Sequence, residues 1–323
     1  MSRRVFLSHL ISLPALAAAP WLFGCSQPHP FVAGIHPWIG YETLNLAREF
    51  RWLPAGVHFR DGKDTSDTLA ALNIGELDAA CLTLDETLVA RTMGVPLTAV
   101  LVFDVSAGSD MVLARPPIKN LADLAGKRLG VEQSTVGELV LEKLLEAAKL
   151  PASALTLVNL PVGQQQIDAW QSNEVDVIIT YEPVASKLLH LGALRLFDSR
   201  QMPDTILDVF AVRIDRAQSH KAALKALIAA HFRALAHLQA NREDAIYRIA
   251  AHQKISVDDV RRALSGVMLP SLVANHEYLS SKEGKLIQAA NEISRLMVRQ
   301  GRLQRNDALD GLISPDWLPP YEG

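Results

Sequence analysis

The sequence predicts an α/β protein of two doubly wound lobes, joined by two crossing strands and followed by a helical C-terminal tail. Short apolar runs alternate with amphipathic segments from residue 31 to residue 212. This alternation is typical of mainly parallel sheets that helices cover on both faces. The alternation breaks and restarts near residue 111, and a chain of 323 residues is long for one hydrophobic core.

The first block of alternation predicts four strands and three helices. Cys81 lies in an apolar run of this block, and we expect it to be a small buried core residue. Ser66 precedes a helical pattern and could be its N-cap. The expected strands are 31–35, 57–59, 77–82 and 97–103, and the expected helices are 41–50, 66–73 and 85–92.

The second block repeats this arrangement and then gives way to helices only. Its longest helix carries a stripe of apolar side chains at helical spacing. The expected strands are 111–114, 129–131, 155–158, 175–179, 194–197 and 206–212, and the expected helices are 138–149, 164–171 and 183–189. After residue 215 the expected helices are 216–240, 242–252, 256–266 and 282–299.

A faint internal repeat supports two similar lobes. Glu76-Leu77-Asp78-Ala79 returns 98 residues later as Glu174-Val175-Asp176-Val177, and in both copies an aspartate opens an apolar strand. The strands at the two breaks, 111–114 and 207–212, are the natural crossings between lobes. We therefore expect lobe one to span 30–112 and 213–323, and lobe two 113–212. Two crossing strands form a hinge, so a ligand would bind in the cleft and closure would bury it.

The first 25 residues have the pattern of an export signal. An apolar stretch, 5–23, follows two arginines, as in a signal peptide. The start resembles a twin-arginine signal, which is an address read by a receptor; the matching residues are Ser2, Arg3, Arg4, Phe6 and Leu7. Leu22-Phe23-Gly24-Cys25 resembles a lipobox, which implies removal of residues 1–24 and a lipid on Cys25. Cleavage after the alanines at 17–19 and a retained membrane anchor are the alternatives.

Composition and motifs exclude several classes of protein. A formal net charge of −3 does not suit a nucleic-acid binder, which usually carries a basic face. Two cysteines exclude a disulfide scaffold and a multi-cysteine metal site, and we expect no metal or cofactor. The sequence has no Gly-x-Ser-x-Gly elbow, no His-Glu-x-x-His pair and no phosphate-binding glycine loop. We therefore expect that the protein is not an enzyme.

An ordered set of short motifs resembles the nitrate/sulfonate/taurine and thiamine-precursor solute-binding proteins of ABC transporters. The motifs lie at 34–41, 75–79, 106–110, 118–131, 176, 181–183, 192 and 196–199. The resemblance implies a type II periplasmic-binding-protein fold. It also implies a monomeric receptor, at the extracytoplasmic membrane surface or in the periplasm, that delivers a small solute to an ABC permease and its ATPase. Synthases of the thiamine pyrimidine resemble this family too, but they carry a cysteine-rich motif that this chain lacks.

Candidate ligand residues follow the carboxyl ends of the expected strands, where open parallel sheets bind ligands. They are Trp38, Gly40, Tyr41, Thr83, Asp85, Ser106, Ser134, Thr135 and Glu182. Six of them also have a structural interpretation: core packing for Trp38, helix capping for Asp85, Ser134, Thr135 and Glu182, and a tight turn around Ser106.

The types of these residues bear on the solute. The candidate loops contain Asp85, Glu86, Asp110 and Glu182, and their only basic residue is His36. An anion site needs amides, hydroxyls and a cationic side chain, with few acids nearby. We therefore expect a neutral or amino-bearing nitrogenous solute, such as a pyrimidine-like compound. A sulfonate or nitrate binder is one alternative, and a lipoprotein that signals to a membrane kinase or cyclase is another.

Overall fold

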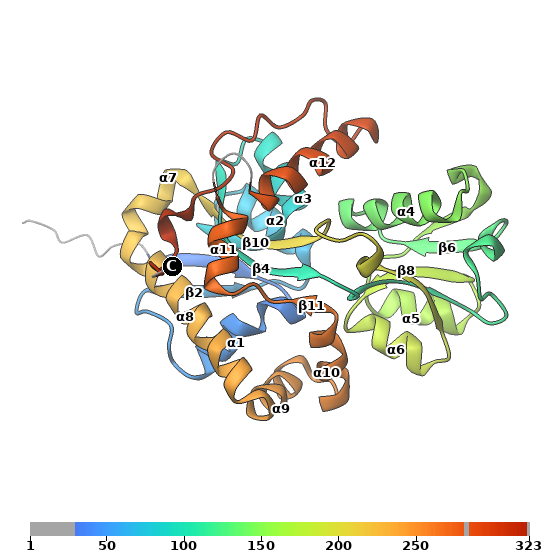
Figure 1. The fold of residues 1–323 in the computed structure, drawn as a ribbon, viewed down its shortest axis with the longest axis horizontal. Coiled ribbons are helices and arrows are strands. Elements are labelled where there is room, and N and C mark those ends of the chain that lie inside the picture. The colour runs from blue at the N-terminus through green and yellow to red at the C-terminus, as the bar shows by residue number, and fades with distance from the viewer. Residues whose placement is uncertain (1–29, 281–283, 322–323) are drawn as a thin grey trace, which may run out of the picture.

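The computed structural model describes residues 30–280 and 284–321, which form two α/β lobes side by side (Figure 1). The larger lobe contains a six-stranded sheet of order β11-β4-β10-β3-β1-β2, and the smaller lobe contains a five-stranded sheet of order β7-β6-β8-β5-β9. The expected signal peptide and Cys25 lie outside the described residues. Among the helices of residues 30–280 and 284–321, none is long and apolar enough to cross a membrane.

The larger sheet is parallel at one side and antiparallel where the chain returns to it. Its strands are β1 (Phe31–Ile35), β2 (Val57–Asp61), β3 (Ala79–Thr83), β4 (Leu97–Ser106), β10 (Leu207–Arg213) and β11 (Val267–Met268). β1 pairs in parallel with β2 and β3, whereas β10 lies antiparallel between β3 and β4. The helices between these strands are α1 (Glu42–Glu49), α2 (Thr65–Asn73) and α3 (Leu84–Thr92). Cys81 is fully buried in β3, as expected.

The smaller sheet is packed on both faces. Its strands are β5 (Asp110–Ala114), β6 (Arg128–Val131), β7 (Thr156–Asn159), β8 (Val177–Tyr181) and β9 (Leu194–Asp198), and its helices are α4 (Thr135–Ala148), α5 (Gln164–Gln171) and α6 (Val184–His190). Successive side chains of a strand point to opposite faces. Accordingly, Val112 and Ala114 join the core under α4, whereas Met111 and Leu113 join the core under α5 and α6.

The chain passes between the sheets earlier than the sequence pattern indicates. β4 leads through residues 107–109 into β5, which pairs with β8 and β9. β9 leads through 199–206 into β10, which pairs with β3 and β4. The chain thus crosses between the lobes at residues 107–109 and 199–206, before the expected lobe boundaries at 112 and 212. Apolar runs show that a strand is buried, but they do not show which sheet supplies its hydrogen-bonding partners.

The C-terminal tail is mostly helical and packs mainly on the larger lobe. It comprises α7 (Ile214–Ala217), α8 (Lys221–Ala240), α9 (Arg242–Gln253), α10 (Val257–Ser265), α11 (Leu272–Tyr278) and α12 (Lys285–Arg299). The sequence pattern did not predict β11 or α11, and residue 282, the expected start of the last helix, lies outside the described residues. The N-cap of α2 is Asp64 rather than Ser66, because the backbone is extended at Asp64 and already helical at Thr65.

The internal repeat marks equivalent positions in the two lobes. Asp78 precedes β3 and accepts a hydrogen bond from the Val32 amide at 2.8 Å, while its own amide donates to the Val32 carbonyl. Asp176 precedes β8 and exchanges the same pair of hydrogen bonds with Arg128, at the start of β6. Each carboxylate also pairs with an arginine, Arg216 for Asp78 and Arg128 for Asp176. The repeated aspartates thus tie β1 to β3 in the larger sheet and β6 to β8 in the smaller one.

We predict that Asp78→Ala lowers the free energy of unfolding by about 2 kcal/mol or more. The carboxylate is buried and bonds both the Val32 amide and the Arg216 guanidinium, 2.9 Å away, so its removal leaves two donors without their acceptor. Urea unfolding at neutral pH measures the change. Asp215→Ala is the control, because its ion pair with Arg213 is half exposed and such pairs contribute about 0.5 kcal/mol. Equal losses in the two variants would contradict the prediction.

Candidate ligand-binding cleft

A small cavity lies between the two lobes, at the carboxyl ends of β1, β3, β6 and β8. About 50 Å³ of it is open to the centres of water molecules, which is room for a few waters or a small solute. Its lining residues come from both lobes: His36, Pro37, Trp38, Thr65, Thr83, Glu86, Asp110, Glu132, Ser134, Val136, Tyr181, Ile206 and Asp208. This is the edge at which open α/β sheets bind ligands.

Two aromatic side chains meet across this cavity. The rings of Trp38, from the larger lobe, and Tyr181, from the smaller lobe, lie edge to face with centroids 5.8 Å apart. The Trp38 indole donates a hydrogen bond to the buried carboxylate of Asp104 at 3.0 Å. A Cβ at Gly40 would lie 1.7 Å from the Asp104 carboxylate, so only glycine leaves room for this contact. Asp104 and Gly40 therefore hold the indole in place.

The carboxyl group of Asp208, in the cavity wall, is hydrogen-bonded by Tyr41. The hydroxyl of Tyr41, which is fully buried behind the cavity, donates a hydrogen bond to Asp208. Burial is the main cause that raises the pKa of Asp208 well above its usual value, and the neighbouring Asp104 raises it further. Tyr41 thus supports the carboxyl group rather than lining the cavity itself.

The cavity is rich in carboxyl groups whose ionised forms are disfavoured. Burial raises the pKa of Glu86 to about 8 and that of Asp110 to about 6, and it raises the pKa of Asp104, which bonds Trp38 but does not line the cavity, to about 8. One carboxylate oxygen of Asp110 and one of Asp104 are buried without a hydrogen-bonding partner. No lysine or arginine is among the residues that line this cavity. The site can therefore form hydrogen bonds with a solute, and a cationic solute would stabilise the ionised forms of these carboxyl groups.

His36 does not supply a positive charge to this cavity at neutral pH. Burial lowers the pKa of its imidazole to about 4. The two ring nitrogens lie 3.1 Å from the Thr65 hydroxyl and 3.4 Å from the Thr68 hydroxyl. His36 is therefore a neutral polar group in the wall.

Three of the nine expected ligand residues line the cavity: Trp38, Thr83 and Ser134. Thr83 is also the N-cap of α3, where it forms a capping box with Glu86, and Ser134 is the N-cap of α4. Each of these two hydroxyl residues is therefore a helix cap as well as part of the wall.

The other expected residues do not line the cavity and make contacts of their own: Gly40, Tyr41, Asp85, Ser106, Thr135 and Glu182. Gly40 and Tyr41 lie behind it, as described. Asp85 and Thr135 are both buried; burial raises the pKa of Asp85, and hydrogen bonds from Thr83 and Thr135 lower it in part. Ser106 bonds Ser199 at 2.7 Å and so joins the two crossing segments.

Several lining residues were absent from the expected set, among them Glu86, Asp110, Glu132, Tyr181 and Asp208. The sequence does contain a signal for Asp208, because it is an acidic residue inside an otherwise apolar strand. Glu86 is three residues beyond the end of β3, at the third position of α3, where the capping box bonds its side chain to the Thr83 amide. Glu132 and Asp110 line the cavity because of how the two lobes are arranged, which the sequence does not show.

Comparison with known families agrees with this architecture. The family described as NMT1/THI5 like matches residues 56–245, which is more than half of the chain. The chain belongs to the NMT1/THI5-like family. This confirms the relationship expected from the ordered motifs. None of the curated proteins matches the chain.

Solved structures with the same fold include binding proteins and an enzyme. The alkanesulfonate-binding protein SsuA from Xanthomonas axonopodis pv. citri, bound to MOPS, is 18% identical with a TM-score of 0.73, over 89% of this chain and 98% of that one. The periplasmic aliphatic sulphonate-binding protein SsuA from Escherichia coli is 18% identical with a TM-score of 0.74, over 92% and 94%. The desulfurization enzyme DSZB is 16% identical with a TM-score of 0.67, over 89% and 97%. The periplasmic-binding fold expected for this member of the family is thereby confirmed.

We predict that stability falls as the pH rises from about 5 to about 8. The pKa of Asp104 is about 4 in the unfolded chain and about 8 in the folded one, so the folded state holds a proton that the unfolded state has lost. Its stabilising contribution is complete below the lower value and is lost as the pH rises to the higher one. Asp104→Asn stays neutral and keeps an acceptor for Trp38, so its free energy of unfolding falls by on the order of 1 kcal/mol less per pH unit.

Urea unfolding at several pH values measures this difference. Asp215→Asn is the control, because its arginine partner lowers the pKa of Asp215 and its titration lies below the window. A pH dependence of Asp104→Asn that parallels the unchanged protein would contradict the prediction.

Proposed function

We propose that the protein is an extracytoplasmic solute-binding receptor without chemistry of its own. Three observations support this: membership of the NMT1/THI5-like family, the periplasmic-binding fold, and a small cavity walled by both lobes. Closure of two lobes over a solute removes it from water and strengthens polar contacts with it. The receptor would pass the solute to an ABC permease with its ATPase. A signalling role toward a membrane kinase or cyclase is the alternative.

The proposed solute is a small nitrogen-bearing molecule that donates hydrogen bonds or carries positive charge. The observation that supports it is the set of four acidic residues in the cavity lining, Glu86, Asp110, Glu132 and Asp208, with no lysine or arginine among the described residues that line the cavity. Buried carboxylates with free lone pairs pair best with N–H donors. The ring of Trp38 offers an apolar surface on which a planar heterocycle could stack.

An alkanesulfonate is the second candidate solute. It is favoured by the printed names of two structural relatives, which bind alkanesulfonates or aliphatic sulphonates. Against it stands the charge of this cavity, because a sulfonate beside several carboxyl groups and no cation would be repelled whenever those groups ionise. The two candidates therefore differ in the sign of charge that the site prefers.

The fold shared with the desulfurization enzyme DSZB raises the alternative that the protein is a catalyst. The one cysteine among the described residues, Cys81, is fully buried in β3, and burial raises its pKa well above the usual value. A reactive cysteine needs access and a lowered pKa. This favours a binding role.

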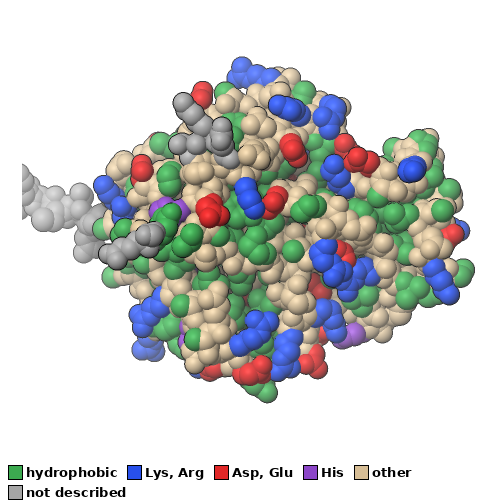
Figure 2. Space-filling view, viewed as in Figure 1, with side chains coloured by type: hydrophobic (Ala, Val, Ile, Leu, Met, Phe, Trp, Pro, Cys, Tyr) green, Lys and Arg blue, Asp and Glu red, His purple; other side chains and the backbone are tan. Residues whose placement is uncertain are grey.

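The location follows from the first residues of the chain. We propose that residues 1–24 are a twin-arginine signal peptide and that a lipid on Cys25 holds the mature monomer at the extracytoplasmic membrane surface. Figure 2 shows lysine and arginine side chains scattered among acidic ones on the face drawn, without one basic field. That distribution, with a net charge of −3, supports a protein that does not bind nucleic acid.

A thermal-shift screen against amines, pyrimidines, sulfonates and nitrate tests the proposal. A solute that binds only the folded protein raises its melting temperature. We expect a shift with a member of the amine or pyrimidine set and none with sulfonates or nitrate. Asp110→Asn should weaken binding of that solute about tenfold and Trp38→Ala should weaken it by roughly 1–3 kcal/mol, measured by calorimetry.

The controls are Asp215→Asn and Trp52→Ala, which change an exposed ion pair and a ring stacked on Phe50, both outside the cavity lining. A shift with an alkanesulfonate that Asp110→Asn strengthens would support the second candidate and overturn the first.

The lipid anchor has its own test. We expect Cys25→Ala to move the protein from the membrane fraction to the soluble fraction, because the acyl chains would have no attachment site. Cell fractionation followed by immunoblotting measures this. Cys81→Ala, which changes the buried cysteine, should leave the protein in the membrane fraction. Membrane retention of Cys25→Ala would indicate an uncleaved anchor instead.

A further inference from the structure

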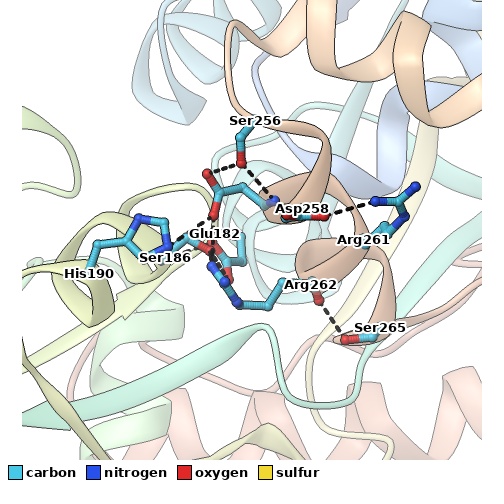
Figure 3. Close-up of polar contacts among 9 residues, drawn as sticks. Glu182, Ser186, His190, Ser256, Asp258, Arg261, Arg262 and Ser265 are labelled. Carbon is cyan, nitrogen blue, oxygen red and sulfur yellow. Dashed lines mark hydrogen bonds and ion pairs between the residues drawn. The ribbon is translucent and has the colours of Figure 1, made fainter.

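One polar contact outside the cavity lining joins the two lobes, between α10 of the larger lobe and α6 of the smaller lobe. Arg262, on α10, donates a hydrogen bond to the Ser186 hydroxyl at 2.8 Å. The same hydroxyl donates to the Glu182 carboxylate at 2.9 Å, and the Ser186 amide donates to that carboxylate at 3.1 Å (Figure 3). A hydroxyl can accept one bond and donate another, so Ser186 links the arginine to the acid.

The two ends of this relay are each anchored in their own lobe. Glu182 and Ser186 are almost fully buried at the start of α6, whose Ala185 and Leu188 belong to the smaller lobe's core. Arg262 is oriented by Asp259 on its own helix at 2.7 Å. The buried residues of α10 belong to the larger lobe's core. Separation of the lobes must therefore break the bond between Arg262 and Ser186.

The bond between Arg262 and Ser186 is not a surface contact, because Ser186 and the neighbouring Glu182 are buried. Burial raises the pKa of Glu182, and the hydrogen bonds from Ser186 and the positive charge of Arg262 lower it in part. Arg262 is the cation that stabilises the charged form of Glu182, and its side chain is two-thirds buried. His190, also on α6, lies 3.6 Å from Asp259 and adds a second contact between the same two helices.

We infer that the relay of Arg262, Ser186 and Glu182 is a latch that holds the lobes closed, and that Arg262 is the positioning residue that sets the balance between closed and open forms. This inference rests on the proposed function, because a receptor uses that balance to capture and release its solute. It gives Glu182, which the sequence placed among the ligand residues, a role at the lobe interface.

On the opposite side of the cleft, more contacts join the two lobes than on the Arg262 side. Arg302, after α12, makes a two-pronged ion pair with Glu138 on α4, and Gln300 bonds Glu142 at 3.1 Å. Leu296 of α12 also packs into the core of the smaller lobe. The Arg262 side has no such apolar insertion from α10, whose buried residues stay in the larger lobe's core. The latch is therefore the weaker side, where a single side chain can shift the balance.

A distance measurement across the cleft tests the latch without any solute. Spin labels are placed on Ile74→Cys and Leu157→Cys, two exposed positions in different lobes, in the full chain with Cys25→Ser so that only buried Cys81 remains. Pulsed electron spin resonance then gives the distribution of distances. We expect a closed population at the distance of this structure, and a closed-to-open ratio about five- to tenfold lower in Arg262→Ala.

Arg261→Ala is the matched control, because Arg261 is the neighbour of Arg262 in the same helix and its ion pairs with described residues, Asp258 (Figure 3) and Glu243, lie within the larger lobe. It should leave the distribution unchanged. Ser186→Ala removes the relay from the other lobe and should open the protein as Arg262→Ala does, which keeps the test valid if one variant folds poorly.

Two results would overturn the latch. One is a distribution in the unchanged protein that lacks the closed distance. The other is an Arg262→Ala distribution equal to that of Arg261→Ala. Either outcome leaves the solute screen unaffected, and a failed screen leaves this measurement intact, so the two proposals fail separately.

Discussion

The cleft depends on the two places where the chain crosses between the sheets. β4 runs directly into β5, and β9 returns the chain to β10, so each sheet contains a strand that points away from its parallel neighbours. Asp104 is near the end of β4, Asp110 opens β5 and Asp208 is near the start of β10. The crossing strands therefore bring the cavity's acids together, and any rotation about them also moves those acids.

These acids carry an energetic cost that a purely structural arrangement would avoid. Burial raises the pKa values of Asp104, Asp110 and Asp208, so the folded state is stabilised when they hold protons. The structure offsets part of this cost with neighbouring donors, the indole of Trp38 and the hydroxyl of Tyr41. Perturbed carboxyl groups in a cavity at an inter-lobe cleft are characteristic of functional sites. A solute that donates hydrogen bonds would bond the carboxyl oxygens for which the described residues provide no donor.

The C-terminal tail does more than cover the larger sheet. From one side α10 presents Arg262 to α6, and from the other α12 and the residues after it reach α4 (Figure 1). Both contacts meet the first turn of a helix in the smaller lobe, next to the strand ends that face the cavity. The tail thus joins the two lobes through residues that lie outside the cavity lining.

The sequence by itself determined the lobed α/β fold, because alternating apolar and amphipathic periods reflect local burial and local helix or strand geometry. It also identified Trp38, Thr83 and Ser134 on the cavity wall, since each follows the end of a strand, and the paired aspartates Asp78 and Asp176, since each opens a buried strand. The strand exchange, the convergence of Asp110 and Asp208, and the place of Glu182 beside Arg262 were decided only by tertiary structure. These contacts join residues far apart in the chain, and no local period or spacing encodes which distant backbone a strand or a side chain will meet.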